Sequence, residues 1–320
     1  MSELATEFVK ATQQAAVAAY PWVGKQRKNP ADAAATEALR NHLNLIDFTG
    51  EIKIGEGEMD EAPMLFIGEK VGTGSGPEID IAVDPIDGTA LVAAGKGNAI
   101  TVIAAADSGS LLHAPDMYME KIAVGPKAKG KISLEVPIGD NLKAVAAANG
   151  KKITELRVAV QKRPRHAELM MAVQRTGAEV VLFSDVDITL AVATCLDEID
   201  IDMVAGVGGA PEGVIGAVAL RILGGDFQGK LLPKNEIQRQ RCLDMGISEP
   251  DRMLLLEDLV ASDNCFFAAT GITDGILLRG LIPGDEHKVR VQSFYTTNVP
   301  EKHYQFVEVE EQLPHRHSFK

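Results

Sequence analysis

The sequence predicts an α/β fold with a mixed N-terminal sheet and a mostly parallel C-terminal sheet, and three observations support this. In the first half of the chain, strand-like runs of alternating apolar residues lie between Ala-rich helical stretches. From about residue 150, strands and helices alternate regularly, and short crossovers of this kind imply parallel pairing. The 320 residues, 46% of them hydrophobic, can bury a large core. We therefore expect two lobes, residues 1–150 and 151–320.

Composition excludes several classes of protein. A formal net charge of −13 argues against a nucleic-acid partner, because a binding face would need excess Lys and Arg. No stretch approaches ~20 consecutive apolar residues, which excludes a membrane span, and the N-terminus lacks the order of a signal peptide. The three widely separated cysteines, Cys195, Cys242 and Cys265, predict free thiols in a reducing cytoplasm.

The N-terminal third contains the first candidate ligands. Helices are expected over residues 3–21 and 31–45, and Asp32 would lie in the first turn of the second, where a dipole-favourable Asp is the plainer interpretation. A strand over residues 51–55 runs directly into an acidic segment that contains Glu56, Glu58, Asp60 and Glu61. Such segments usually face solvent, but the interposed Gly57 permits close backbone approach. This favours a metal role for Glu56 and leaves the other acids open.

The stretch Ile79–Ala90 combines carboxylates with a sharp turn. Alternating apolar residues predict a strand, and Pro85 is expected to end its hydrogen-bond ladder. Asp84 and Asp87 are three residues apart and can hold divalent cations. Gly88 and Thr89 lead into an apolar helical segment, where their free N–H groups can hold a phosphate. An Asp-rich turn with a helix cap is the plainer alternative.

Tyr118 is a candidate ligand in the middle of the chain. Residues 98–106 should form a buried strand, and 122–124 another. Tyr118 precedes the latter, and an ordinary half-buried aromatic is favoured over a ligand hydroxyl. Residues 126–141 are rich in Gly, Lys and Pro and predict a turn-rich connection.

The β–α units after residue 150 carry charged side chains at their junctions. Strands are expected at 156–160, 179–183 and 200–204, followed by helices at 167–175, 188–195 and 213–223. In open α/β sheets, ligands bind at the carboxyl ends of parallel strands. These ends carry Arg163, Arg165, Asp185, Asp187 and Glu212. Planar guanidinium groups match phosphate oxygens, so this edge predicts an anion-binding site.

The glycines at 206–209 depart from the spacing of a dinucleotide fingerprint and lack its downstream acid. Residues 226–260 predict a loop and a charged helix, and 264–270, 288–295 and 304–309 predict strands.

The candidate acids together predict metal-assisted phosphate hydrolysis. They are Asp32, Glu56, Asp84, Asp87 and Glu212. Hard oxygen ligands without a Cys or His cluster suit Mg²⁺ or Mn²⁺. In a two-metal site, ions about 3.5–4 Å apart activate water and stabilise the leaving oxygen.

These motifs resemble a known family. Asp84–Thr89, preceded by Glu56-Gly-Glu58, is similar to the metal motif of the lithium-sensitive phosphatase superfamily, which includes fructose bisphosphatases and inositol monophosphatases. More narrowly, the chain resembles bacterial class II fructose-1,6-bisphosphatases over about residues 15–280. The resemblance is carried by segments 54–65, 114–121, 208–213 and 269–273. The resemblance implies a layered α-β-α-β-α sugar phosphatase fold, a metal-binding N-terminal lobe, a sugar-phosphate-binding C-terminal lobe, and a site at their junction.

The resemblance also implies a role for each residue. Asp32 and Glu56 would bind one Mn²⁺ or Mg²⁺ ion, and Asp84, Asp87 and Glu212 a second. The reacting phosphate would contact Asp87, Gly88, Thr89 and Tyr118, with Thr89, Asp60 and Glu212 in catalytic roles and Lys28 a weaker candidate. The remote phosphate and sugar hydroxyls would contact Arg163, Pro164, Arg165, Asp185, Val186, Asp187 and Gly209. Members commonly carry Glu where this chain has Asp87, and the shorter arm would loosen one metal contact.

The main hypothesis is therefore a cytoplasmic, homo-oligomeric phosphatase of fructose 1,6-bisphosphate, acting in gluconeogenesis. Sedoheptulose 1,7-bisphosphate and inositol phosphate are alternative substrates for the same chemistry. A non-catalytic sugar-phosphate sensor is the remote alternative, because it would not need all five carboxylates.

Overall fold

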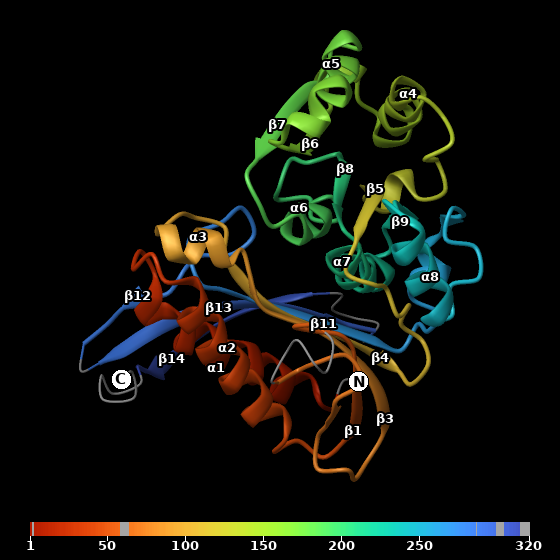
Figure 1. The fold of residues 1–320 in the computed structure, drawn as a ribbon. Coiled ribbons are helices and arrows are strands. Elements are labelled where there is room, and N and C mark those ends of the chain that lie inside the picture. The colour runs from red at the N-terminus through yellow and green to blue at the C-terminus, as the bar shows by residue number, and fades with distance from the viewer. Residues whose placement is uncertain (2, 58–63, 286, 299–303, 314–320) are drawn as a thin grey trace. The chain divides into compact units, whose positions relative to one another are not determined.

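The computed structural model describes residues 1, 3–57, 64–285, 287–298 and 304–313. The chain forms two compact units, here called unit 1 (Met1–Gly109 with Asn264–Lys320) and unit 2 (Ser110–Asp263) (Figure 1). The boundary expected at residue 150 differs from this division. Strand β5 (Tyr118–Val124) pairs with later strands of unit 2, while β11 (Cys265–Gly271) returns to pair with β4 (Ile100–Asp107) of unit 1.

Unit 1 is built on a mixed sheet, as predicted. Within the described residues its strands are ordered β12-β13-β11-β4-β3-β1-β2, with β14 on β13. The pair β1–β3 is parallel and the other pairs are antiparallel. The remaining bounds are Thr49–Ile54 (β1), Lys70–Val71 (β2), Glu78–Asp87 (β3), Ile282–Pro283 (β12), Lys288–Thr297 (β13) and Gln305–Gln312 (β14).

Two helices, α1 (Ala5–Ala19) and α2 (Lys28–Leu43), bury their apolar faces in unit 1. In α1, Phe8 is fully buried, with its ring centroid 5.4 Å from that of Phe48 and 5.3 Å from that of Phe266. The helix α2 begins before Pro30 rather than after it, because proline is tolerated in a first helical turn.

Strand β3 does not end at Pro85, which corrects the sequence-based expectation. Asp84 pairs with Val102 and Asp87 with Ile100, with a register shift between them. The Pro85 carbonyl accepts a hydrogen bond of 2.8 Å from the Thr101 hydroxyl. A bulge accommodates a proline that cannot donate to the ladder. The two carboxylates are therefore held on one strand and not on either side of a strand end.

Unit 2 contains a second mixed sheet, ordered β10-β9-β5-β8-β6-β7 in the described chain. The predicted strands β6 (Arg157–Gln161), β7 (Glu179–Phe183) and β8 (Met203–Gly209) are parallel, with β6 in the middle. The prediction of a mostly parallel sheet is wrong, because β5, β9 (Asp226–Leu231) and β10 (Met253–Leu254) pair antiparallel. β9 lies in a segment for which the sequence predicts a loop.

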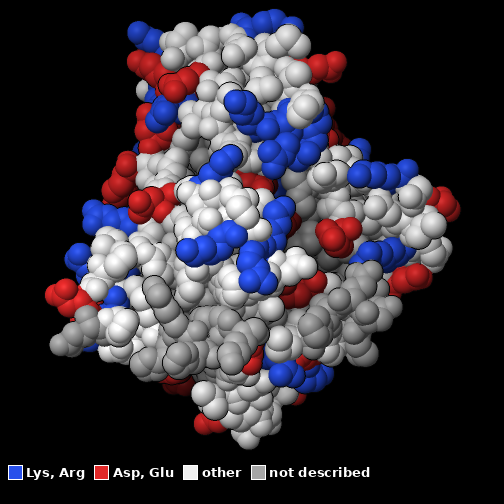
Figure 2. Space-filling view, turned by 60° about the vertical axis from the view of Figure 1, so that its left-hand side comes forward, with Lys and Arg blue, Asp and Glu red and all other residues white. Residues whose placement is uncertain are grey.

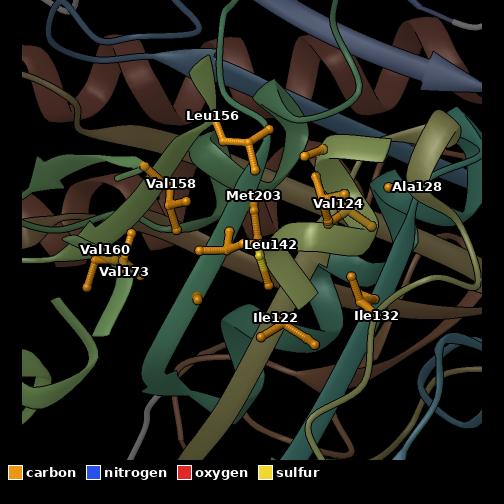
Figure 3. Close-up of a cluster of buried hydrophobic side chains, with 14 residues drawn as sticks. Ile122, Val124, Ala128, Ile132, Leu142, Leu156, Val158, Val160, Val173 and Met203 are labelled. Carbon is orange, nitrogen blue, oxygen red and sulfur yellow. The ribbon is translucent and has the colours of Figure 1, made fainter. Parts of the chain in front are cut away.

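Helices surround this sheet and complete its core. Their bounds are Ile138–Asn149 (α4), Ala167–Arg175 (α5), Ile188–Ala193 (α6), Ala210–Leu223 (α7), Glu236–Asp244 (α8) and Leu256–Leu259 (α9). Figure 3 shows Leu142 of α4 among Val158, Met203 and Ile122 of three strands. The helix α4 starts inside the expected turn-rich connection, and its Leu142 is fully buried. Burial of Leu142 together with Val145 and Ala146 makes α4 part of the core.

Two expectations drawn from composition can be compared with the structure. The three cysteines are free thiols, as predicted. In the part of the chain that the structure describes, no helix is long and apolar enough to span a bilayer.

Candidate active site

Three carboxyl groups converge in unit 1. They are Asp32 of α2, Glu56 just after β1, and Asp84 of β3. Burial, and then the negative charges of Asp32 and Asp84, raise the pKa of Glu56 to about 9, and its protonated carboxyl shares a hydrogen bond with Asp32. Burial likewise raises the pKa of Asp32. Negative charge is unfavourable here unless a proton or a cation balances it.

The Glu56 carboxyl is positioned by a close backbone approach. The Glu56 N–H donates to the Leu65 carbonyl at 3.0 Å. A Cβ added at Gly55 would lie 2.0 Å from the same carbonyl oxygen, so no larger residue fits there. The sequence predicts a close approach at Gly57, and the structure shows one at Gly55.

Thr89, two residues beyond the end of β3, contacts the Asp32 carboxyl group. Its hydroxyl hydrogen-bonds with the Asp32 side chain and lies 3.1 Å from the Ile86 carbonyl. Gly88, with a φ of +96°, turns the chain from β3 into α3 (Thr89–Ala94). A left-handed residue here favours glycine. The predicted turn and helix after Asp87 are thus confirmed, and the Thr89 hydroxyl lies beside Asp32, a predicted metal ligand.

The other predicted residues of unit 1 are less closely grouped. Asp87 is buried, with 7% of its surface exposed, at the end of β3. Lys28 is exposed at the start of α2, and Asp60 lies outside the described residues. Among the residues that the structure describes, no set of three His, Cys, Asp or Glu side chains meets the geometry of a metal site. Placing Asp87, Lys28 and Asp60 at the site stays a prediction.

In unit 2, the carboxyl ends of β6, β7 and β8 lie at one sheet edge, as predicted. The Arg163 guanidinium forms an ion pair of 3.6 Å with Asp185, and Pro164 begins the turn η4 (Pro164–His166). Arg165 donates to the Val207 carbonyl at 2.7 and 3.0 Å. Its guanidinium carbon lies 4.8 Å from the centre of the Tyr118 ring, which is 38% exposed. In the upper part of Figure 2, Lys and Arg side chains gather in a cluster.

His166, which is absent from the predicted site, fixes the geometry of this edge. It is 2% exposed. Its Nδ1 lies 2.7 Å from the Gln161 carbonyl and its Nε2 accepts from the Val207 N–H at 2.8 Å. These partners require a neutral ring protonated on Nδ1. His166 therefore ties the end of β6 to β8 and does not add a charge to the anion site.

Lys121 is a second residue absent from the predicted site. It is 5% exposed, and its Nζ pairs with Asp187 at 2.6 Å and donates to the Gly209 carbonyl at 3.0 Å. The available signal was a lone lysine in the apolar strand β5. Lys121 thereby joins two of the predicted substrate contacts.

Glu212 lies beside this pair. Burial raises the pKa of Glu212, opposed by the charge of Lys121 and assisted by that of Asp187. Its Oε2 is buried without a hydrogen-bond partner among the described residues. Lys121, Asp187 and Glu212 line a cavity of about 10 Å³, room for about one water molecule. A buried carboxylate oxygen without a partner is suited to a cation.

Val186 is held in a strained conformation between two predicted contacts. Its φ is +69° and it is 2% exposed. A β-branched residue rarely adopts this region, and the strain persists only where the surroundings enforce it. The backbone at Val186 therefore sets the directions of Asp185 and Asp187.

Gly209→Ala tests how Glu212 is placed. A Cβ at Gly209 would lie 1.8 Å from the Glu212 Oε2, so the carboxylate must move. We expect kcat/KM for a phosphate ester to fall about tenfold with little loss of stability, because a side chain moves more easily than backbone. Gly139→Ala is the matched control, since its Cβ would meet only Thr176 at 3.6 Å. Equal kinetics of the two variants would contradict this arrangement.

Comparisons with known proteins agree with the resemblance found in the sequence. The family model described as bacterial fructose-1,6-bisphosphatase, glpX-encoded, matches residues 2–310. Over 292 residues, the chain is 48% identical to fructose-1,6-bisphosphatase 1 class 2 of Escherichia coli K12 and to fructose-1,6-bisphosphatase class 2 of Shigella flexneri, covering 87% of each chain. It is also 48% identical over 291 residues to the class 2 enzyme of Haemophilus influenzae, again with 87% of each chain covered. The chain therefore belongs to the bacterial fructose-1,6-bisphosphatase family.

Proposed function

We propose that this protein is a phosphatase that hydrolyses the 1-phosphate of fructose 1,6-bisphosphate, giving fructose 6-phosphate and phosphate. Its relatives, 48% identical over 87% of both chains, are named fructose-1,6-bisphosphatases. The observation that carries the chemistry is the convergence of Asp32, Glu56 and Asp84 beside the Thr89 hydroxyl. Sedoheptulose 1,7-bisphosphate remains the second candidate substrate, because it also carries two phosphates.

The donor chemistry of these carboxyl groups suits a hard divalent cation. Three converging carboxyls offer oxygen donors, which hard divalent cations prefer. Burial and two neighbouring carboxylates raise the pKa of Glu56 to about 9, so negative charge is unfavourable there unless a cation balances it. We assign Asp32 and Glu56 to one Mn²⁺ or Mg²⁺ ion and Asp84 and Asp87 to a second, and Glu212 is a candidate metal ligand of unit 2. When bound, such ions neutralise phosphoryl oxygens and lower the pKa of a water molecule.

The other groups act on the substrate directly. The Thr89 hydroxyl, bonded to Asp32, is placed to orient the attacking water. At the edge of unit 2, Arg165 would hold the remote phosphate. The resemblance implies that Tyr118 contacts the reacting phosphate, but its ring centre lies 4.8 Å from the Arg165 guanidinium carbon, so we assign Tyr118 to the remote phosphate instead. Asp185 and Asp187 would accept hydrogen bonds from sugar hydroxyls.

Phosphate release from fructose 1,6-bisphosphate tests this function. Purified protein is stripped with EDTA, dialysed, and assayed alone, with Mn²⁺ and with Mg²⁺. We expect release that requires added metal and that excess chelator abolishes, since the carboxylates cannot replace the charge of the cation. Sedoheptulose 1,7-bisphosphate and inositol 1-phosphate are assayed in parallel. Release from inositol 1-phosphate alone would mean that the proposed substrate is wrong. If no ester releases phosphate, the proposal that the protein is a phosphatase is wrong.

A cytoplasmic location and a homo-oligomeric state also belong to this proposal. Free thiols are consistent with a reducing compartment. The oligomeric state is measurable by sedimentation of the full-length protein.

A further inference from the structure

Two cations lie against the ring of Tyr118. The Arg165 guanidinium carbon is 4.8 Å from the ring centre, and the Lys234 Nζ is 4.5 Å from it. Lys234 belongs to the loop between β9 and α8 (Figure 1), 69 residues beyond Arg165 in the sequence. Tyr118 thus brings together two charges that no local sequence pattern connects.

Lys234 is held in this place by its neighbours. The Leu232 N–H donates to the Tyr118 carbonyl at 2.9 Å, which extends the pairing of β5 with β9. The Lys234 N–H donates to the Gln238 side chain at 2.7 Å, and the Asn235 side chain accepts from the Gln238 N–H at 2.9 Å, capping α8. The loop backbone is therefore anchored at both ends. This fixes the position from which the Lys234 side chain extends to the Tyr118 ring.

Neither cation is neutralised by a carboxylate. Among the residues that the structure describes, Arg165 and Lys234 make no ion pair, whereas the neighbouring Arg163 pairs with Asp185. The N–H groups of Arg165 go to a backbone carbonyl and to Gln161. A cation–π contact at an exposed site contributes only about 0.5–1 kcal/mol, less than a charge-assisted hydrogen bond to an anion. In a chain of net charge −13, two unpaired cations at one ring indicate an anionic ligand.

We propose that Lys234 is part of the subsite for the second phosphate of the bisphosphate substrate and favours bisphosphates over monophosphates. This inference rests on the proposed function. A phosphate ester carries close to two negative charges and several acceptor oxygens, so it can accept from the planar Arg165 fork and from the compact Lys234 ammonium together. Lys234 binds the substrate end that does not react, and so contributes affinity and selectivity rather than chemistry.

Lys234→Ala, Lys234→Arg and the control Lys143→Ala test this role. Lys143 is also exposed and lies in unit 2, but it pairs with Asp140 at 2.7 Å. For Lys234→Ala, we expect the KM for fructose 1,6-bisphosphate to rise about tenfold with kcat within twofold of the parent. A lost charge-assisted contact has this magnitude. Lys234→Arg should keep most of the affinity, and Lys143→Ala should match the parent.

Calorimetric binding of fructose 6-phosphate gives a second readout that needs no turnover. Lys234→Ala should raise its Kd about tenfold at low salt, and by less in 0.5 M KCl because salt screens the contact. A purely structural role would lower the melting temperature and leave the KM and Kd unchanged. An unchanged Kd, or a raised Kd that Lys234→Arg does not reduce, would overturn the proposal. If the parent protein binds fructose 6-phosphate but hydrolyses no ester, the proposed function fails while Lys234 is still tested.

Discussion

Glu56→Gln should reduce kcat/KM for fructose 1,6-bisphosphate by at least about a thousandfold, while making the metal-free protein more stable. The activity is lost because an amide cannot supply the negative oxygen that a divalent cation requires. The stability is gained because the amide removes a carboxyl that burial and two neighbouring carboxylates disfavour. Phosphate release and thermal unfolding in EDTA measure the two effects.

The matched control for this prediction is Glu37→Gln. Glu37 is exposed on α2, the helix that carries Asp32. The control should retain activity and stability, whereas the melting temperature of metal-free Glu56→Gln should rise by about 3 °C, since ~1 kcal/mol shifts a protein of this size by a few degrees. Full activity in Glu56→Gln would show that Glu56 does not bind a metal ion needed for activity. A lower melting temperature would show that its charge is not a source of instability.

The pH dependence of stability follows from the same carboxyl group. The pKa of Glu56 is raised from 4.5 to about 9, so between these values the folded metal-free protein holds a proton that the unfolded chain releases. Stability from this group is complete below about pH 4.5 and is lost as the pH rises towards 9. Comparing Glu56→Gln with the parent in EDTA should show a difference that grows across this interval.

Arg165→Ala should raise the KM for fructose 1,6-bisphosphate about fiftyfold and change kcat by no more than a few-fold. Arg165 has two bonds to one backbone carbonyl and a ring contact with Tyr118 that fix its guanidinium. A fixed fork loses little entropy on binding phosphate, and a charge-assisted contact is worth about 1.5–3 kcal/mol. Steady-state kinetics with the bisphosphate measures the effect.

Arg163→Ala should have a smaller effect, about fivefold on the KM. The Arg163 guanidinium already pairs with Asp185, and its side chain is 37% exposed. Arg175→Ala, at the end of α5, serves as a control for the loss of one positive charge from unit 2. Equal KM values for Arg165→Ala and Arg175→Ala would mean that only net charge attracts the substrate, and the remote-phosphate site would have to lie elsewhere.

Much of the fold could be predicted where a segment's pattern agreed with its final environment. The bounds of β7 and α5 were predicted to the residue, and the parallel pairing of β6, β7 and β8 was confirmed. The prediction failed for β8, which was placed several residues too early. Its glycines have low strand propensity, and pairing with β5 and β6 outweighs that preference.

The sequence by itself determined the chemistry of this protein. The acids, the arginines and the turn at Gly88 and Thr89 are identifiable without coordinates, because residue type sets what a side chain can bind. Only the tertiary structure decided which distant residues support them. Lys121 acquires its role from the pairing of β5 with β8, and Lys234 from the loop that follows β9. Strand pairing brings together residues about a hundred positions apart, and a local pattern does not encode that proximity.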